Sequence, residues 1–344
     1  MTQLVPEVRH EAAPERVATD ELELAVGLRG TAVAGRSRPL GFSGLRLHPV
    51  ALSGQAFGQC VDMLAAERIL DAFVDAGGNA IDTADSYAGG ASELMIGSWI
   101  RSRNARSRVV LATKVGRHPD NPGVSAKAIT RAVDASLERL QTDEIDLLFL
   151  DLDDPDVPFE ETLLAVDELI RVGKVRHFGA SDHPGDRYIE ARVMAAQAGV
   201  ARMVAMQSRY SLIEREAYEE GLAPLAAQQE LSVMPRSPLA DGLLAGAGQE
   251  RGRGELAAAL ARMTGAASGH AVRRAARVLA AVGEVAEEHG APPATVAVAW
   301  LLTRPDVVAP VVGVTSPERL EELMAAAELP LTRRQVADLD DASR

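Results

Sequence analysis

The chain has 344 residues, of which 47% are apolar and only 3% aromatic, and its formal net charge at pH 7 is −13. So few aromatic side chains and so acidic a balance argue against a nucleic-acid partner, which needs stacking platforms and basic residues. The chain has no apolar run of about 20 residues and no leader-like start, so we expect a cytoplasmic protein with no membrane partner. Cys60 is the only cysteine, which excludes an internal disulfide, and we expect it to be packed near a helix start.

The first 36 residues mix polar residues with alanine and show no sustained period. This composition predicts a flexible N-terminal tail, with a short helix near residues 19–28. Residues 38–48 place a Ser-Gly turn between two short apolar runs, which is typical of a β-hairpin. We expect residues 37–344 to form one domain.

Eight short apolar runs alternate with helical segments along this domain. Runs that are apolar throughout indicate parallel strands buried on both faces. They are residues 50–54, 79–83, 108–113, 145–150, 175–180, 203–207, 231–235 and 308–312.

The helical segments carry recognisable start and stop signals. Ser125 is a good N-cap for a helix whose apolar residues Ile129, Ala132, Val133, Leu137 and Leu140 form one stripe. The next helix is expected over residues 160–172, and Gly173 after it allows the chain to turn into the following strand.

Seven of the strands end near a polar residue or a glycine. These residues are Asp82 with Tyr87 just beyond it, Lys114, Asp151, Ser181, Gln207, Arg236 and Gly313. Side chains gathered at the C-terminal ends of eight parallel strands form the active face of a (β/α)₈ barrel, which typically needs about 250 residues. The sequence therefore predicts an α/β fold, a single TIM barrel.

The alternation breaks once, between Arg236 and about Ala271, where the chain is rich in glycine, alanine and arginine. This stretch follows the seventh strand, so we expect it to lie over the active face. Long loops at this place are usually lids or binding loops. Plain surface disorder is the alternative.

Several motifs now resemble those of the aldo-keto reductases. They are Gly78-Asn-Ala-Ile-Asp-Thr-Ala-Asp-Ser-Tyr87 with Ser92 and Glu93, Leu111-Ala-Thr-Lys114, residues 173–181, Ser237-Pro-Leu239 and Pro310-Val-Val-Gly313. The match runs from about Arg38 to about Asp341, and the hairpin resembles the plug that closes the barrel bottom in that family. The order and spacing of so many motifs make chance a poor explanation.

The resemblance implies an oxidoreductase that transfers a hydride from NADPH to the carbonyl of a small-molecule substrate. By motif match, Tyr87 donates the proton that the resulting alkoxide needs, because a phenol with a pKa of about 10 is protonated at neutral pH. Lys114 is expected to lower that pKa, and Asp82 to hold Lys114 in place.

The family's fourth catalytic residue is a histidine, and its position here holds Asp151. An ionised carboxylate accepts hydrogen bonds but donates none. Asp151 could be protonated because of burial near Asp82, which suggests enone or iminium reduction as in the branch of the family that carries an acid here. It could instead bind a cationic group or act as a base, or it could be paired with Lys114 in a decayed site.

Other departures fall on positions that hold the cofactor in the family. Asp182 replaces an asparagine that binds the nicotinamide carboxamide, Arg236 replaces the aromatic residue that stacks on the nicotinamide, and Leu323 replaces an asparagine that contacts the adenosine. The matching positions are Ser181, Gln207, Ser237, Leu239, Gly313, Arg319 and Glu322. Arg319 and the helix start after Gly313 could hold the 2′-phosphate of NADP, and Arg236 could lie on a ring or grip a phosphate.

Two histidines and an acidic cluster complete the candidates. His118 and His183 could replace the missing imidazole, although exposed loop positions are the ordinary alternative. A possible metal site is suggested by the acidic cluster Asp151, Asp153, Asp154 and Asp156. Strand alternation sends neighbouring side chains to opposite sides, however, and no histidine or glutamate partner is close in sequence. We therefore expect no metal.

Three hypotheses follow. The first is an atypical NADPH-dependent aldo-keto reductase with Tyr87, Lys114, Asp82 and Asp151 as its catalytic residues. The second is a lyase, dehydratase or isomerase on the same barrel, and the third is a non-catalytic partner subunit. The sequence does not name the substrate or fix the oligomeric state, because fold alone does not determine function.

Overall fold

The computed structural model describes residues 37–246, 253–265 and 268–344. The expected tail and the short helix near residues 19–28 lie outside these residues. No helix in the described ranges is long and apolar enough to cross a membrane.

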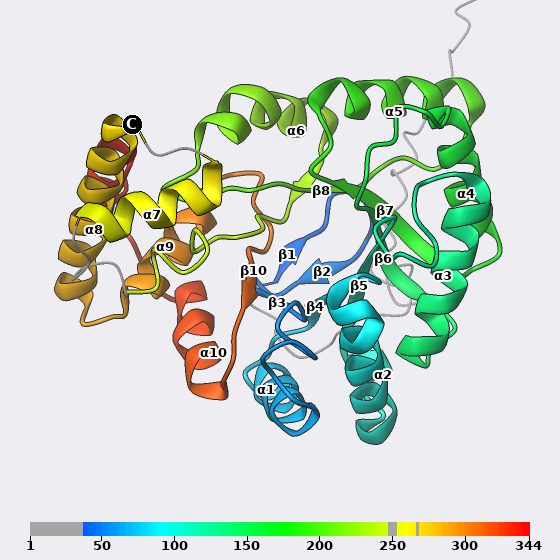
Figure 1. The fold of residues 1–344 in the computed structure, drawn as a ribbon, viewed down its shortest axis with the longest axis horizontal. Helices are drawn as coiled ribbons and strands as arrows, with labels where there is room; N and C mark the ends of the chain where they lie inside the picture. The colour runs from blue at the N-terminus through cyan, green and yellow to red at the C-terminus, as the bar shows by residue number, and fades with distance from the viewer. Residues whose placement is uncertain (1–36, 247–252, 266–267) are drawn as a thin grey trace, which may run out of the picture.

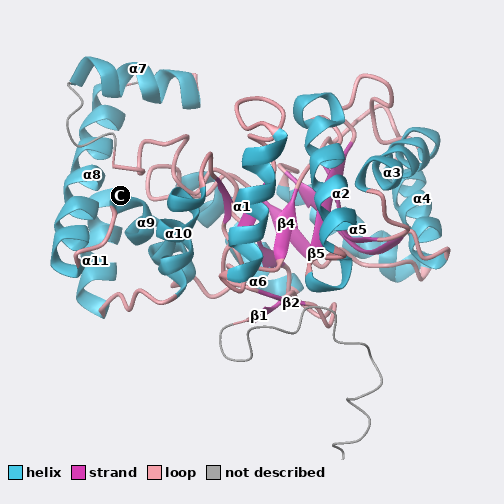
Figure 2. Ribbon diagram, turned by 90° about the horizontal axis from the view of Figure 1, so that it is seen from below, coloured by secondary structure: helices cyan, strands magenta, loops and turns pink. Residues whose placement is uncertain are grey.

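The described chain begins with the predicted hairpin. Strand β1 (Arg38–Pro39) pairs antiparallel with β2 (Arg46–Leu47). Leu40 and Leu47 are fully buried in a cluster that includes Phe149, a residue of the barrel wall. The hairpin therefore plugs one end of the barrel, below the strands in Figure 2.

The eight predicted strands form one parallel sheet, in the order β10-β3-β4-β5-β6-β7-β8-β9. Backbone bonds close it into a (β/α)₈ barrel, because Val308 N–H donates to Val233 O at 2.9 Å and Val311 N–H to Pro235 O at 2.8 Å. The strands are β3 (Ala51–Ser53), β4 (Ala80–Asp82), β5 (Val110–Val115), β6 (Ile145–Leu150), β7 (Val175–Ser181), β8 (Ala205–Gln207), β9 (Ser232–Val233) and β10 (Val311–Gly313).

Helices surround this sheet (Figure 1). They are α1 (Met63–Asp75), α2 (Ala91–Arg103), α3 (Ala126–Leu140), α4 (Phe159–Arg171), α5 (Gly185–Ala198), α6 (Ala223–Gln229), α7 (Arg253–Thr264), α8 (Gly269–His289), α9 (Pro293–Leu302), α10 (Pro317–Met324) and α11 (Arg333–Ser343). The predicted cap of α3 is confirmed, since the Ser125 hydroxyl accepts from Ala128 N–H at 3.3 Å and the whole predicted stripe is buried. Gly173 follows α4 at a φ of +79°, as its role in turning the chain requires.

The segment after β9 differs from the irregular loop that we expected. It contains α7, which buries Leu256, Ala259 and Leu260 and packs on α8. The glycines around α7 hide this short apolar stripe from a sequence pattern. Figure 2 shows α7 towards the end of the barrel opposite the hairpin.

Cys60 also differs from expectation, because its side chain is exposed. The helix start lies further along the chain, where the Asp62 carboxylate accepts from Ala65 N–H at 2.8 Å and α1 begins at Met63. Cys60 is thus part of the preceding turn.

Gly97 is the residue of α2 that allows close packing on α3. A Cβ at Gly97 would lie 2.3 Å from Arg139 O and 2.6 Å from Leu140 C. We predict that Gly97→Ala lowers the free energy of unfolding by about 2 kcal/mol, despite the better helix propensity of alanine. Urea unfolding measures this loss. The control is Gly221→Ala, where no atom lies within 4 Å of the new Cβ; an equal effect in both variants would contradict the packing argument.

Candidate active site

A buried ion pair joins the ends of β4 and β5. Lys114 Nζ lies 2.6 Å from Asp82 Oδ2 and donates to Thr83 O at 2.8 Å, and the two residues are 2% and 1% exposed. Gln207 Nε2, at the end of β8, donates to the other Asp82 oxygen at 2.6 Å. Burial alone would lower the pKa of Lys114, but Asp82 and Tyr87 outweigh it and raise that pKa above its ordinary value. Lys114 therefore stays an ammonium.

Tyr87 lies directly over this pair. It opens a short 3₁₀ turn (Tyr87–Gly90) after β4, and Lys114 Nζ is 4.8 Å from the centroid of its ring. Burial raises the pKa of Tyr87 more than Lys114 lowers it, and Asp82 raises it further. Lys114 thus lowers the pKa of Tyr87 as expected, but burial outweighs it and the net direction is upward. The phenol remains protonated at neutral pH, as a proton donor must be.

Asp151 follows β6 and faces a cation that the sequence analysis did not single out. Its N–H donates to Val115 O at 2.9 Å, and its Oδ2 lies 3.2 Å from Arg117 Nε. Lys114 directs its ammonium hydrogen bonds at Asp82 and Thr83 instead, so the structure does not show the alternative in which Asp151 is paired with Lys114. Burial raises the pKa of Asp151, Lys114 and Arg117 oppose this, and the net direction is upward.

The other two charged departures, Asp182 and Arg236, contact each other. Arg236 Nε donates to Asp182 Oδ1 at 2.9 Å, and its Nη2 pairs with the second carboxylate oxygen, which makes a bidentate ion pair. Asp182 has a φ of +55°, in the left-handed region. Sequence analysis treated these residues as separate changes, but the fold makes them one interaction.

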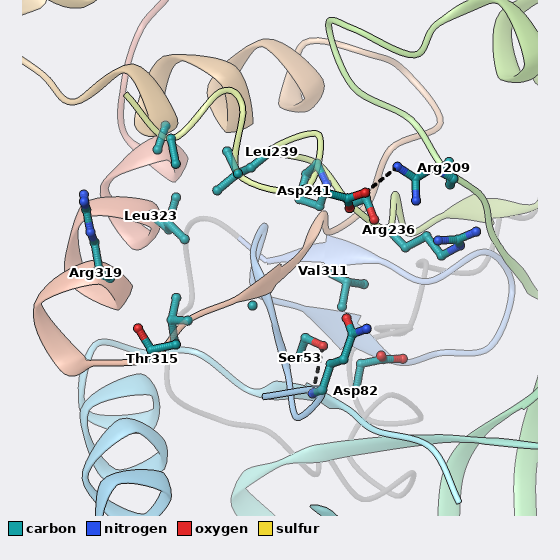
Figure 3. A pocket seen from close by; sticks show the side chains of 18 of the residues that line it. Ser53, Asp82, Arg209, Arg236, Leu239, Asp241, Val311, Thr315, Arg319 and Leu323 are labelled. Carbon is teal, nitrogen blue, oxygen red and sulfur yellow. Dashed lines mark hydrogen bonds and ion pairs between the residues drawn. The ribbon is translucent and has the colours of Figure 1, made fainter. Parts of the chain in front are cut away.

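A cavity of about 700 Å³ extends from Asp82 and Tyr87 to α10 (Figure 3). Nine of the predicted residues line it: Asp82, Tyr87, Gln207, Arg236, Ser237, Leu239, Gly313, Arg319 and Glu322. Leu323 lines it too. Lys114 and Ser181 are buried at strand ends beside it, and Asp182 is attached to it through Arg236.

The far end of the cavity carries a cation and a helix start. Ser316 caps α10 by accepting from Arg319 N–H at 3.4 Å, and Arg319 Nη1 lies 2.6 Å from Glu322 Oε2. The Arg319 side chain is still 57% exposed. An exposed cation at the positive end of a helix suits a phosphate.

Sequence reasoning missed five polar residues of this cavity: Ser53, Gln55, Arg209, Asp241 and Thr315. Arg209 pairs with Glu214 through two 2.8 Å contacts and reaches Asp241 at 3.1 Å. Ser53 ends β3 and Arg209 is two residues past Gln207. A search for polar residues at strand ends, as used for the other candidates, would therefore have identified both.

The two candidate histidines are not exposed loop residues. His118 is 7% exposed and its Nδ1 accepts from Asp120 N–H at 3.2 Å. His183 is 3% exposed, with its ring near those of Phe159 and Tyr188, and burial lowers its pKa. Neither lines the cavity, and Nε2 of His183 is buried without a hydrogen-bond partner among the described residues.

Asp85 is a buried acid that the sequence analysis overlooked. It is 1% exposed, and neither carboxylate oxygen has a hydrogen-bond partner among the described residues. Burial and then Glu93 raise the pKa of Asp85 to about 7, against smaller opposing effects of Gly116 and Arg139.

Known proteins resemble this chain over nearly its whole length. Residues 51–344 match the sequence model of the Aldo/keto reductase family. An uncharacterized oxidoreductase of Bacillus subtilis, YrpG, is 33% identical, over 88% of this chain and 94% of its own. Norsolorinic acid reductase B of Aspergillus parasiticus is 32% identical (84% and 77%), and a probable voltage-gated potassium channel subunit beta of rice, Oryza sativa subsp. japonica, is 31% identical (88% and 94%).

We predict that Lys114→Met lowers the free energy of unfolding by about 3–5 kcal/mol, because it leaves the Asp82 carboxylate buried and unpaired. Adding Asp82→Asn should restore more than half of the loss. As a control, Lys174→Met breaks an exposed pair with Asp134 and should cost less than about 1 kcal/mol. Denaturant titration of the variants measures each free energy of unfolding. If the losses caused by Lys114→Met and Asp82→Asn simply add in the double variant, the two residues are not coupled and the prediction is wrong.

The raised pKa of Asp85 predicts that this residue lowers the free energy of unfolding by an amount that depends on pH. An aspartate in the unfolded chain ionises near pH 4, whereas Asp85 in the folded protein ionises near pH 7. Between about pH 4 and 7 the unfolded chain therefore has lost a proton that the folded chain keeps. The free energy of unfolding falls as pH rises through this range. Asp85→Asn should therefore stabilise the protein more at pH 8 than at pH 5.5, by on the order of 2 kcal/mol. Thermal and urea unfolding at both pH values test this. The control Asp156→Asn, at an exposed residue, should show no such difference.

Proposed function

Because the chain belongs to the aldo/keto reductase family, we propose that it is an NADPH-dependent oxidoreductase that reduces a carbonyl, enone or imine of a small molecule. One observation carries this proposal: Tyr87 stands over the buried Lys114–Asp82 pair at one end of a cavity whose other end carries Arg319. The reductase names of the relatives support the reaction class.

The residues of the cavity fit NADPH. The volume of about 700 Å³ lies within the usual range for ligand pockets, and hydroxyl and amide groups line it between Tyr87 and Arg319. Arg319 and the first turn of α10 would hold the 2′-phosphate, which favours NADPH over NADH. We propose these cofactor-binding residues: Ser181, Asp182, Gln207, Arg236, Ser237, Leu239, Gly313, Arg319 and Glu322.

When bound, NADPH supplies the hydride. Tyr87 gives its phenolic proton to the substrate oxygen as negative charge develops there. The Lys114 ammonium then stabilises the phenolate. Asp82 holds Lys114 in position, and Gln207 in turn holds the Asp82 carboxylate. Water restores the proton to Tyr87.

Asp151 is the altered fourth member of this site. We propose that it acts as a neutral acid that donates a hydrogen bond to the substrate; burial, which raises its pKa, acts in the direction that this role needs. A substrate that displaces Arg117 from Asp151 raises that pKa further, because it removes one of the two charges that oppose the rise. Enones and imines are the substrate classes for which an added acid is useful.

We predict that Tyr87→Phe reduces turnover by about 10²–10⁴-fold, the usual contribution of a positioned proton donor. The NADPH dissociation constant should change by less than about threefold, since the ring stays and only the hydroxyl is lost. Fluorescence titration and single-turnover oxidation of NADPH with a panel of carbonyl, enone and imine substrates measure both quantities. Tyr218→Phe, a buried tyrosine outside the cavity, is the matched control.

Titration of the wild-type protein with NADPH, with NADH in parallel, comes before any substrate. Binding in the low micromolar range with preference for NADPH supports the proposal. No binding up to about a millimolar, a free energy of only about −4 kcal/mol, would sink it. The search would then turn to non-redox turnover and to protein partners.

A further inference from the structure

Arg117 stands on a short loop whose ends are tied together. Gly116 follows β5, and its carbonyl oxygen accepts from Gly123 N–H at 2.9 Å. Inside the loop, Nδ1 of His118 accepts from Asp120 N–H at 3.2 Å. Gly116 has a φ of +122°, a conformation that favours glycine. These contacts hold the backbone on either side of Arg117, so its position at the mouth of the barrel is defined.

The Arg117 side chain is held by a single ion contact. Its Nε lies 3.2 Å from Asp151 Oδ2, and its two Nη groups form no hydrogen bond to the described residues. The side chain is 52% exposed, against 14% for Asp151. Because a guanidinium carries five N–H donors in a planar fork, the Nη edge of Arg117 has donors to offer to a ligand.

Other basic side chains near the strand ends each make at least two contacts with acidic groups. They are Arg187, Arg209 and Arg236. Arg319 is exposed and has one acidic partner, but we have assigned it to the cofactor phosphate. Among these side chains, Arg117 therefore has the greatest unused capacity to bind an anion.

Arg117 lies beside the reacting groups but outside the cofactor cavity. Asp151 N–H donates to Val115 O at 2.9 Å, which ties the end of β6 to that of β5. The charge of Asp151 acts on the pKa values of both Lys114 and Tyr87, so these groups lie close to one another. Neither Arg117 nor Asp151 lines the cavity of about 700 Å³ that we assign to NADPH. An anion held at Arg117 therefore belongs to the substrate.

The proposed role of Asp151 also calls for such an anion. When Asp151 carries the proton that it donates to the substrate, the Arg117 cation has no ionised partner among the described residues. A carboxylate of the substrate would supply one, because the two oxygens of a carboxylate match the fork of a guanidinium.

We propose that Arg117 binds a carboxylate of the substrate, and that Asp151 competes with this carboxylate while it is ionised. The substrate is then a carbonyl compound, enone or imine that also carries a carboxylate. This inference rests on the proposed function, whose substrate class it narrows.

The test uses two pairs of compounds that differ in one charge: 4-formylbenzoate with 4-formylbenzamide, and 4-oxopent-2-enoate with its methyl ester. With NADPH, the wild-type protein should favour the carboxylate of at least one pair by about tenfold or more in kcat/KM, since a hydrogen bond to a charged group is the stronger one. Arg117→Met should reduce this preference to less than about twofold. Arg117→Lys should keep part of it, because lysine retains the charge but not the planar fork.

Binding without turnover separates the anion site from the reaction. Isothermal titration calorimetry with NADP⁺ present, where no reduction takes place, gives the dissociation constants of 4-formylbenzoate and 4-formylbenzamide. Asp151→Asn should tighten 4-formylbenzoate relative to the amide by about three- to tenfold, because it removes the competing negative charge. The same variant should lower turnover, since its proposed proton donor is lost. A merely structural Asp151 would not produce this opposite pair of effects.

Arg108→Met is the matched control. Arg108 lies at the other end of β5, is also 52% exposed, and pairs with Asp75 at 3.8 Å. Its substitution should leave the carboxylate-to-amide ratio unchanged. Thermal melting confirms that each variant is folded, and the NADPH dissociation constant is measured for each.

Each contrary outcome identifies which idea fails. A carboxylate preference that is absent from the wild type in both pairs, or that survives Arg117→Met, would overturn the inference and leave the proposed function standing. If Arg117→Met weakens NADPH as much as it weakens 4-formylbenzoate, Arg117 serves the cofactor and the inference is wrong. If the wild type does not bind NADPH, the proposed function fails, and the calorimetric ratio still decides whether Arg117 binds a carboxylate.

Discussion

The Asp82–Lys114 ion pair is the constraint around which the site is arranged. Two buried opposite charges are stable only when their remaining hydrogen-bonding groups are satisfied. Gln207 donates a hydrogen bond to one Asp82 oxygen, and Thr83 O accepts one from the Lys114 ammonium. Residues from three strands of the barrel therefore form or support this pair. A permanently charged lysine under the ring of Tyr87 is the result, and a phenol that gives up its proton only when negative charge develops nearby fits that environment.

The charged departures from the family pattern are also paired. Asp151 lies against Arg117, and Asp182 is held by Arg236. Each of these two acids therefore lies beside a basic side chain. Such compensation is more consistent with a site rebuilt as a unit than with unrelated substitutions.

The elements of the fold were largely predictable, because each depends on local pattern. Apolar runs identified the strands, Ser125 and Gly173 marked helix ends, and the hairpin at residues 38–48 was recognisable from its turn. Helix α7 was missed because its apolar stripe is short and flanked by glycines. Burial at single positions was also missed: Cys60 is exposed, and His118 and His183 are buried.

The sequence by itself determined the order of strands and helices, the polar residues that stand at strand ends, and the resemblance to the aldo-keto reductases. Only the tertiary structure decided which charges meet. Gln207 and Asp82 are 125 residues apart and Arg236 and Asp182 are 54 apart, so closure of the barrel brings them together. The tertiary structure also decided the direction of each pKa shift, because that direction depends on burial and on several neighbours at once. Tyr87 is the example: its pKa is raised although a charged lysine lies next to its ring.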